Sequence, residues 1–202
     1  MEGAMKDFVR HQIQSSVDTL SLVLSTEAIH STLIAESERI AIAVRRGGKL
    51  MIAGNGGSAA DAQHLAAEFV SRLTIDRPAL RAVALTTDSS ILTAIGNDYG
   101  YERVFSRQIE AIGRPDDIFL GISTSGNSPN VLCALQQCRN MGNHSVGFTG
   151  GSGGKMNNLC DALVVVPSHI TAKIQEAHLM MEHILCGLVE RFYFGRDRFP
   201  EA

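Results

Sequence analysis

The sequence is poor in cysteine, in long hydrophobic runs and in positive charge, and each shortage excludes a class of protein. Four cysteines without C-x-x-C spacing are too few for a disulfide scaffold and predict reduced thiols in a cytoplasmic protein. The longest apolar runs, such as residues 162–167, are far too short to cross a bilayer, and residues 1–10 lack the apolar core of a signal peptide. A formal charge of −3 provides no basic surface, which argues against nucleic acid as the partner.

The composition is that of a globular protein. Of the 202 residues, 45% are hydrophobic and 19% are charged, which is enough for one sizeable core and little for two. Neither a repeat nor a proline-rich linker interrupts the chain. We therefore predict a single domain over residues 1–202, with N-terminal helices over 1–47 and an α/β core with a C-terminal helix over 48–195.

Two hydrophobic patterns divide the chain. Apolar residues recur at helical spacing from about residue 6 to 46, which predicts two helices that end at Gly47-Gly48. Short apolar runs then alternate with helical patterns, and these runs occupy residues 50–53, 82–85, 118–122, 145–148 and 163–166. Runs without polar alternation are typical of strands that are buried on both faces. The fold class is therefore α/β, with a doubly wound, flavodoxin-like five-stranded parallel sheet flanked by helices.

The last helical pattern, over residues 174–194, has a broad apolar face. Together with the N-terminal helices it offers more apolar surface than one face of a sheet can cover. We therefore expect these helices to take part in oligomerisation.

Glycine-rich and hydroxyl-rich loops follow two of the predicted strands, where open α/β sheets bind ligands. The first loop is Gly54-Asn55-Gly56-Gly57-Ser58, which lets a ligand approach the backbone at a helix amino terminus. A tight strand–helix turn is the alternative interpretation. Ser58 and Asp61 also have the spacing of a capping box.

The second loop is Ser123-Thr124-Ser125-Gly126-Asn127-Ser128. Ser128 before Pro129 has the pattern of a helix N-cap, but a cap leaves the other hydroxyls unexplained. Neither loop is a Walker A motif, and the first is also not the six-residue dinucleotide fingerprint. Hydroxyl groups without a lysine favour a monophosphate, so these loops predict a sugar phosphate as the ligand. A third glycine-rich stretch, residues 150–154, has the pattern of a plain turn.

Polar pairs on two predicted helices could perform chemistry. His64 and Glu68 are four residues apart, which suits either a metal site or a solvent-exposed ion pair. On the last helix the local spacing favours a salt bridge between His178 and Glu182.

Other polar residues have less informative spacing. Gln175 and His183 are eight residues apart, roughly 12 Å along a helix. Asn97 and Asp98 fall in a predicted loop, where the turn chemistry of their side chains accounts for them.

Four ordered motifs together closely resemble the phosphoheptose isomerases, the sedoheptulose 7-phosphate isomerases of the SIS (sugar isomerase) fold family. The motifs are AGNGGSAADAQHLAAE at residues 53–68, ALTTDSSILTAIGNDY at 84–99, ISTSGNS at 122–128 and IQEAHLMMEH at 174–183. The resemblance covers nearly the whole chain. It implies conversion of D-sedoheptulose 7-phosphate to D-glycero-D-manno-heptose 7-phosphate. This is the first step toward the activated heptose of lipopolysaccharide core or related surface glycans.

The resemblance also implies roles for individual residues. The phosphate would be held by Ser123, Thr124, Ser125 and Ser128. The sugar chain would be contacted by Asn55, Gly56, Gly57, Asn97 and Asp98, with Glu68 and Gln175 also in the substrate-binding set. One zinc ion per subunit would be bound by His64, Glu68, Gln175 and His183. Glu68 and His183 would be the acid/base pair, which overrides the local preference for His178 and Glu182.

The spacing of Gln175 and His183 is too long for both to bind one small ion on a straight helix. We therefore expect the site to lie where helices of different subunits meet, in a homotetramer. The nearest rival is a non-catalytic SIS-fold regulator that binds the replication initiator, and a sugar-phosphate sensor is the second. The regulators lack the glutamate that this sequence has at Glu68, so the enzyme is favoured.

Overall fold

The computed structural model describes residues 2–195 and Phe199. One sheet contains β1 (Leu50–Ala53), β2 (Ala82–Ala84), β3 (Ile118–Ile122), β4 (His144–Gly150) and β5 (Ala162–Val166). All neighbouring pairs are parallel, and the order β2-β1-β3-β4-β5 confirms the predicted flavodoxin-like sheet. Strand β4 is longer than predicted because its pairing with β5 continues to Gly150.

Seven α-helices lie in the described part of the chain. They are α1 (Glu2–Ser25), α2 (Glu27–Arg45), α3 (Gly57–Val70), α4 (Ser89–Tyr99), α5 (Ser106–Ile112), α6 (Pro129–Met141) and α7 (Thr171–Phe194). Short 3₁₀ turns, η1 (Tyr101–Arg103) and η2 (Gly154–Asn158), complete the connections. Helix α7 begins before the predicted residue 174 because the amide of Ile174 already bonds to the carbonyl of Ile170.

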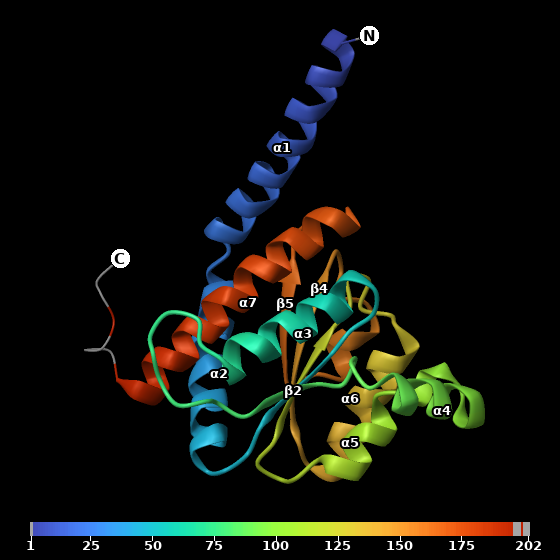
Figure 1. Cartoon of the computed structure of the whole chain (residues 1–202). Helices are drawn as coiled ribbons and strands as arrows, with labels where there is room; N and C mark the ends of the chain where they lie inside the picture. The colour runs from blue at the N-terminus through green and yellow to red at the C-terminus, as the bar shows by residue number, and fades with distance from the viewer. Residues whose placement is uncertain (1, 196–198, 200–202) are drawn as a thin grey trace.

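Helices cover both faces of the sheet (Figure 1). Alternate residues of a strand point to opposite faces, so Leu50 and Ile52 pack with α2, α3 and α7, whereas Met51 packs with α5 and α6. All four residues of β1 are buried, as expected of a central parallel strand. Burial on both faces therefore confirms the prediction for the central strands β1 and β3, whereas the edge strands β2 and β5 are only partly buried.

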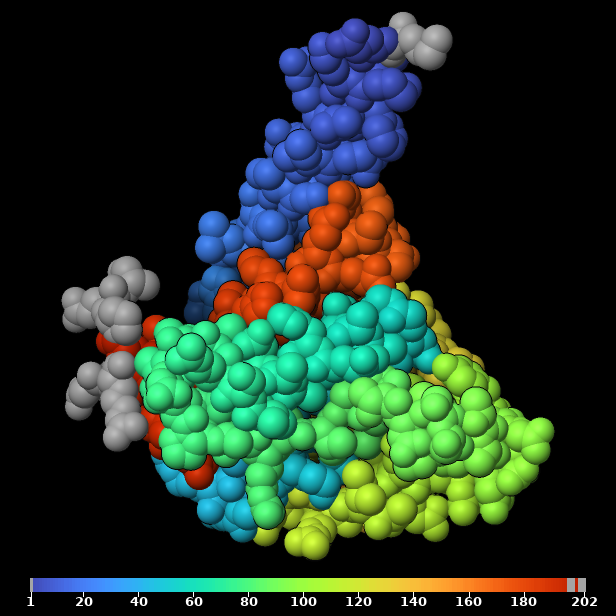
Figure 2. Space-filling model, in the orientation of Figure 1, coloured from blue at the N-terminus to red at the C-terminus, as the bar shows by residue number. Residues whose placement is uncertain are grey.

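Helix α1 extends away from this body (Figures 1 and 2). Only Thr19 and Val23 of its residues are buried, while Phe8 and Ile13 are 59% and 61% exposed. Helix α1 thus has an apolar surface that the described chain does not cover.

No helix among the described residues has the length and hydropathy needed to cross a membrane.

A buried ion pair attaches the connection between α3 and β2 to α7. Arg77 donates from Nε to Glu190 at 2.8 Å, and both side chains are fully buried. Glu190 also accepts the backbone amides of Leu73 and Thr74. Arg77 in turn donates from Nη2 to the carbonyl oxygen of Glu68 at 2.8 Å. This network therefore connects the α3–β2 segment to the backbone of a predicted catalytic residue.

Candidate active site

The loops after β1 and β3 meet where the strand order reverses, the position at which doubly wound sheets bind ligands. Asn55 and Asn130 exchange side-chain hydrogen bonds of 2.8 Å across this point, and the hydroxyl of Tyr101 lies 3.4 Å from Asn55. Asn130 is buried and was missed from the sequence, where its only signal is a polar residue just after Pro129. Its role is to hold Asn55 in place.

The hydroxyl-rich loop after β3 turns its serines toward one another. Ser123 and Ser128 lie 2.8 Å apart through their Oγ atoms. Ser128 occupies the N-cap position of α6, as predicted, but its hydroxyl bonds to Ser123 and makes no cap hydrogen bond. Since an Oγ can donate one proton and accept others, one hydroxyl of this pair is left free to donate to a ligand.

The glycine-rich loop brings α3 against α7. The N-cap of α3 is Gly56, with a φ of 57° that favours glycine, and no side chain caps the helix. The predicted capping box is therefore wrong: Ser58 is the second helical residue and is buried. A Cβ atom on Gly57 would meet the side-chain amide of Gln175, so the start of α3 lies against this residue of α7.

Three of the four predicted zinc ligands lie together on α3 and α7. The Nε2 atoms of His64 and His183 are 2.8 Å apart, and His64 Nε2 is 3.6 Å from Glu68 Oε1. One ligand atom from each residue lies within 4.8 Å of the others. Two imidazoles and a carboxylate are a donor set that suits zinc with an open coordination position. The set thus fits zinc and excludes the simpler view of His64 and Glu68 as an isolated surface pair.

The fourth predicted ligand, Gln175, has its side-chain amide against the start of α3. It lies against Gly57, two turns of α7 before His183. For His64, Glu68 and His183, however, no subunit boundary is needed, because parallel packing of α3 and α7 brings them together in the same chain.

Behind the cluster, α7 contains a histidine and a glutamate that do not pair with each other. His178 directs Nε2 to the carbonyl of Thr149 at 3.1 Å, and burial lowers its pKa to about 4 against the opposing effect of that bond. Burial, reinforced by the charge of Asp61, raises the pKa of Glu182 to about 8. The predicted salt bridge between His178 and Glu182 is thus wrong, because burial disfavours the charged form of both groups.

The raised pKa of Glu182 predicts a pH-dependent stability. Its ordinary pKa is 4.5 and its folded value is about 8, so the folded protein holds a proton that the unfolded chain releases. The free energy of unfolding should therefore fall as pH rises from about 4.5 to 8. Relative to Glu182→Gln, wild type should lose about 3 kcal/mol between pH 5 and 8, measured by urea unfolding in EDTA. Glu38→Gln should retain the wild-type profile, and equal profiles for wild type and Glu182→Gln would contradict the prediction.

Asn97 and Asp98 lie in the last turn of α4, which corrects the prediction of a loop. Asp88 accepts the amide of Ile91 at the helix start, and the helix continues to Gly100, whose φ of 91° ends it. Both side chains are exposed, and their one mutual bond runs from Asn97 Nδ2 to Asp98 Oδ1 at 2.7 Å. Among the described residues, the side chains of Asn97 and Asp98 therefore make no hydrogen bond to Asn55 or Asn130.

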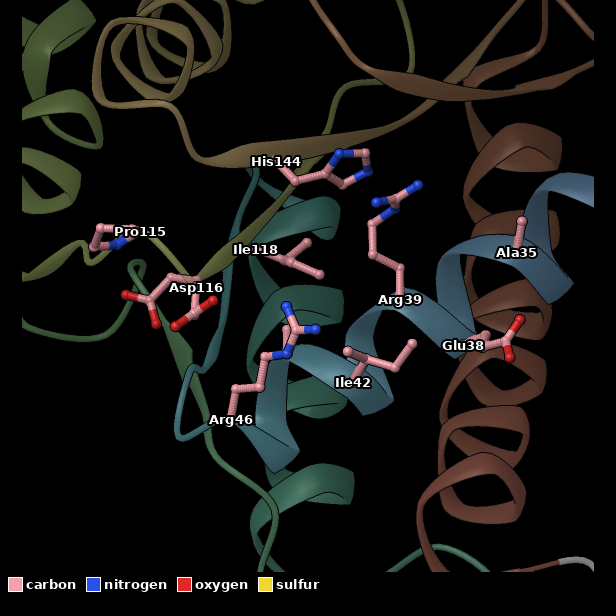
Figure 3. Close-up of a pocket in the computed structure, with 11 residues that line it drawn as sticks. Ala35, Glu38, Arg39, Ile42, Arg46, Pro115, Asp116, Ile118 and His144 are labelled. Carbon is pink, nitrogen blue, oxygen red and sulfur yellow. The ribbon is translucent and has the colours of Figure 1, made fainter.

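A cavity of about 470 Å³ lies away from these loops, at the amino ends of β3 and β4 (Figure 3). It is lined by Arg39 of α2, by Arg46 just after that helix, and by acidic residues, among them Glu38 and Asp116. None of the predicted site residues lines it. The candidate site is therefore at the opposite edge of the sheet.

Comparison with known proteins identifies the family of this chain. The SIS domain family matches residues 13–150. The phosphoheptose isomerase of Burkholderia pseudomallei is 51% identical over 98% of this chain and 100% of its own length. That of Roseiflexus sp. is 54% identical over 93% of this chain and 94% of its own. The solved phosphoheptose isomerase of Neisseria gonorrhoeae is 39% identical, with a TM-score of 0.86 over 92% of this chain and 98% of that one. The chain therefore belongs to the phosphoheptose isomerase family of SIS-domain proteins.

Proposed function

We propose that this protein converts D-sedoheptulose 7-phosphate to D-glycero-D-manno-heptose 7-phosphate, the first step toward an activated heptose for lipopolysaccharide core or related surface glycans. The observation that carries the proposal is the meeting of Glu68, His64 and His183 beside the ligand-binding edge of the sheet. A ketose–aldose exchange needs a base at carbon and an acid at oxygen, and a carboxylate next to an imidazole provides both.

In this mechanism the phosphate end of the substrate is held by Ser123, Thr124, Ser125 and Ser128. Glu68 removes a proton from C1 of the ketose and returns it to C2 through an enediol. His183 exchanges protons with the two oxygens, so that the carbonyl moves from C2 to C1 and no atom is lost. Asn55, whose side chain is fixed by its bonds to Asn130, would contact the sugar hydroxyls.

Zinc is the proposed metal, with His64, Glu68 and His183 as its ligands in one chain. When bound it would supply a Lewis acid at the substrate oxygens. Glu68 cannot bind metal tightly and act as a free base in the same step, so these two roles compete. Gln175, whose amide lies against Gly57, is the proposed fourth metal ligand and also a proposed substrate-binding residue.

The test is direct observation of the reaction by NMR. Sedoheptulose 7-phosphate incubated with the protein and zinc should give the signals of the aldose, and the unphosphorylated ketose should give none. Zinc content is measured on the same sample. Binding of the sugar phosphate without any aldose would instead identify a sensor or regulator.

The free thiols of all four cysteines support a reducing, cytoplasmic site of action.

We also propose a homotetramer that forms through the exposed apolar side of α1. Sedimentation equilibrium should give the mass of four 21.7-kDa chains. Charging this surface with Phe8→Glu and Ile13→Glu should release smaller species, since both side chains are more than half exposed in the single chain. His11→Gln, an exposed position on the other side of α1, is the control. Monomers with full turnover would show that the site does not depend on assembly.

A further inference from the structure

A further hollow lies beside the hydroxyl-rich loop. Its volume is about 260 Å³, and loops after three adjacent strands line it. Thr124 and Ser125 come from the loop after β3, Gly151 and Ser152 from the loop after β4, and Ser168 and His169 from the loop after β5. We call this hollow the His169 pocket. It shares two residues with the proposed phosphate-binding set but extends beyond that set.

The lining of the His169 pocket is chemically suited to an anion. It contains hydroxyl groups and one imidazole, and no carboxylate. Ser125 Oγ accepts the amide of Asn127, and Ser168 Oγ accepts that of Ile170, both at 3.2 Å. A hydroxyl whose oxygen is engaged as an acceptor keeps its proton available for a ligand. The pocket therefore presents O–H donors without a competing negative charge.

The ring of His169 lies beside Gly151 at the pocket wall. Its Nδ1 lies 2.9 Å from the position that a Cβ atom of Gly151 would occupy. Gly151 has a φ of 61°, so both its conformation and the adjacent ring favour glycine. Among the described residues, His169 has no side-chain hydrogen bond or ion pair to the rest of the chain. Its ring is exposed at the pocket and available to a ligand.

We propose that His169 binds the phosphate of the substrate from the side opposite the Ser/Thr loop and sets the preference for phosphorylated sugars. This inference rests on the proposed isomerase function and names a substrate-binding residue for it. An imidazole has at least one N–H donor whether neutral or protonated. A hydrogen bond to a charged group of this kind corresponds to roughly 10- to 100-fold in affinity.

The kinetic test separates binding from chemistry. His169→Ala should raise KM for sedoheptulose 7-phosphate about 10-fold or more while kcat stays within twofold, because the phosphate is remote from the reacting carbons. His169→Gln, which retains an N–H donor, should recover part of this loss. Gly151→Ala should raise KM in the same way by displacing the ring. His30→Ala, on α2, should behave as wild type.

A binding measurement keeps this proposal distinct from the proposed reaction. Inorganic phosphate should shift the imidazole NMR signals of His169 in the wild-type protein, whether or not the protein turns over. Phosphate should also inhibit the wild type more strongly than His169→Ala. An active isomerase in which phosphate leaves the His169 signals unmoved and His169→Ala has a normal KM would overturn the inference. Phosphate-shifted signals without any aldose product would instead overturn only the reaction.

Discussion

Replacing Glu68 with glutamine should lower kcat by about 10²- to 10⁴-fold, the range expected when a positioned general base is removed. Glutamine has the shape of glutamate but cannot take the C1 proton. The backbone carbonyl of Glu68, which accepts from Arg77, is untouched by the substitution, so the fold should persist. The measurement is kcat for aldose formation under saturating sedoheptulose 7-phosphate, with circular dichroism as the check on folding.

The matched control for this variant is Glu38→Gln, on the exposed side of α2, which should retain wild-type kcat. Because Glu68 is also a proposed zinc ligand, the zinc content of Glu68→Gln must be measured beside its activity. Loss of turnover in a variant that still holds zinc assigns the loss to the missing base. Normal activity in Glu68→Gln would instead remove Glu68 from the mechanism.

Removing the carboxylate of Glu190 should destabilise the protein by about 3–5 kcal/mol, the usual cost of leaving one partner of a buried ion pair alone. Arg77 and Glu190 are both fully buried, so in Glu190→Ala the guanidinium would lose its counter-charge where water cannot replace it. The amides of Leu73 and Thr74 would lose their acceptor at the same time. The free energy of unfolding in urea measures the effect.

A neighbouring ion pair is the control for this experiment. Arg72 and Asp76 lie in the same segment, 3.9 Å apart, but their side chains are 61% and 96% exposed. Asp76→Ala should therefore leave the free energy of unfolding nearly unchanged. A small effect of Glu190→Ala would mean that water enters the site and solvates Arg77. Since Arg77 also holds the carbonyl of Glu68, Glu190→Ala should lower kcat as well.

The strands of the sheet were predictable because each one is marked by a run of neighbouring apolar residues. Strands β1 and β3 begin and end where their apolar runs do, since a strand buried on both faces must be apolar throughout. Helix α4 was less predictable at its end. Asn97 and Asp98 favour turns, yet the helix continues through them, because Gly100 provides the positive φ that ends it.

The site was only partly predictable, because most of its contacts join distant segments. The sequence shows that His64 and Glu68 share a helix face, and the motif resemblance adds His183. Neither source shows that Asn130 holds Asn55, that Arg77 reaches Glu68 or that His169 lies against Gly151. These contacts depend on how separate elements pack, which residue spacing does not encode.

By itself, the sequence determined the strands, their parallel arrangement and the two loops at their carboxyl ends, because buried runs and glycine-rich turns are properties of neighbouring residues. The tertiary structure decided which side chains meet. Packing of α3 on α7 brings His183 to His64 and leaves Gln175 at Gly57. The same packing buries Glu182 and directs His178 to a backbone carbonyl, where local spacing favoured a salt bridge. The physical reason is desolvation: burial by distant residues determines whether a charged pair is stable, and local spacing cannot report burial.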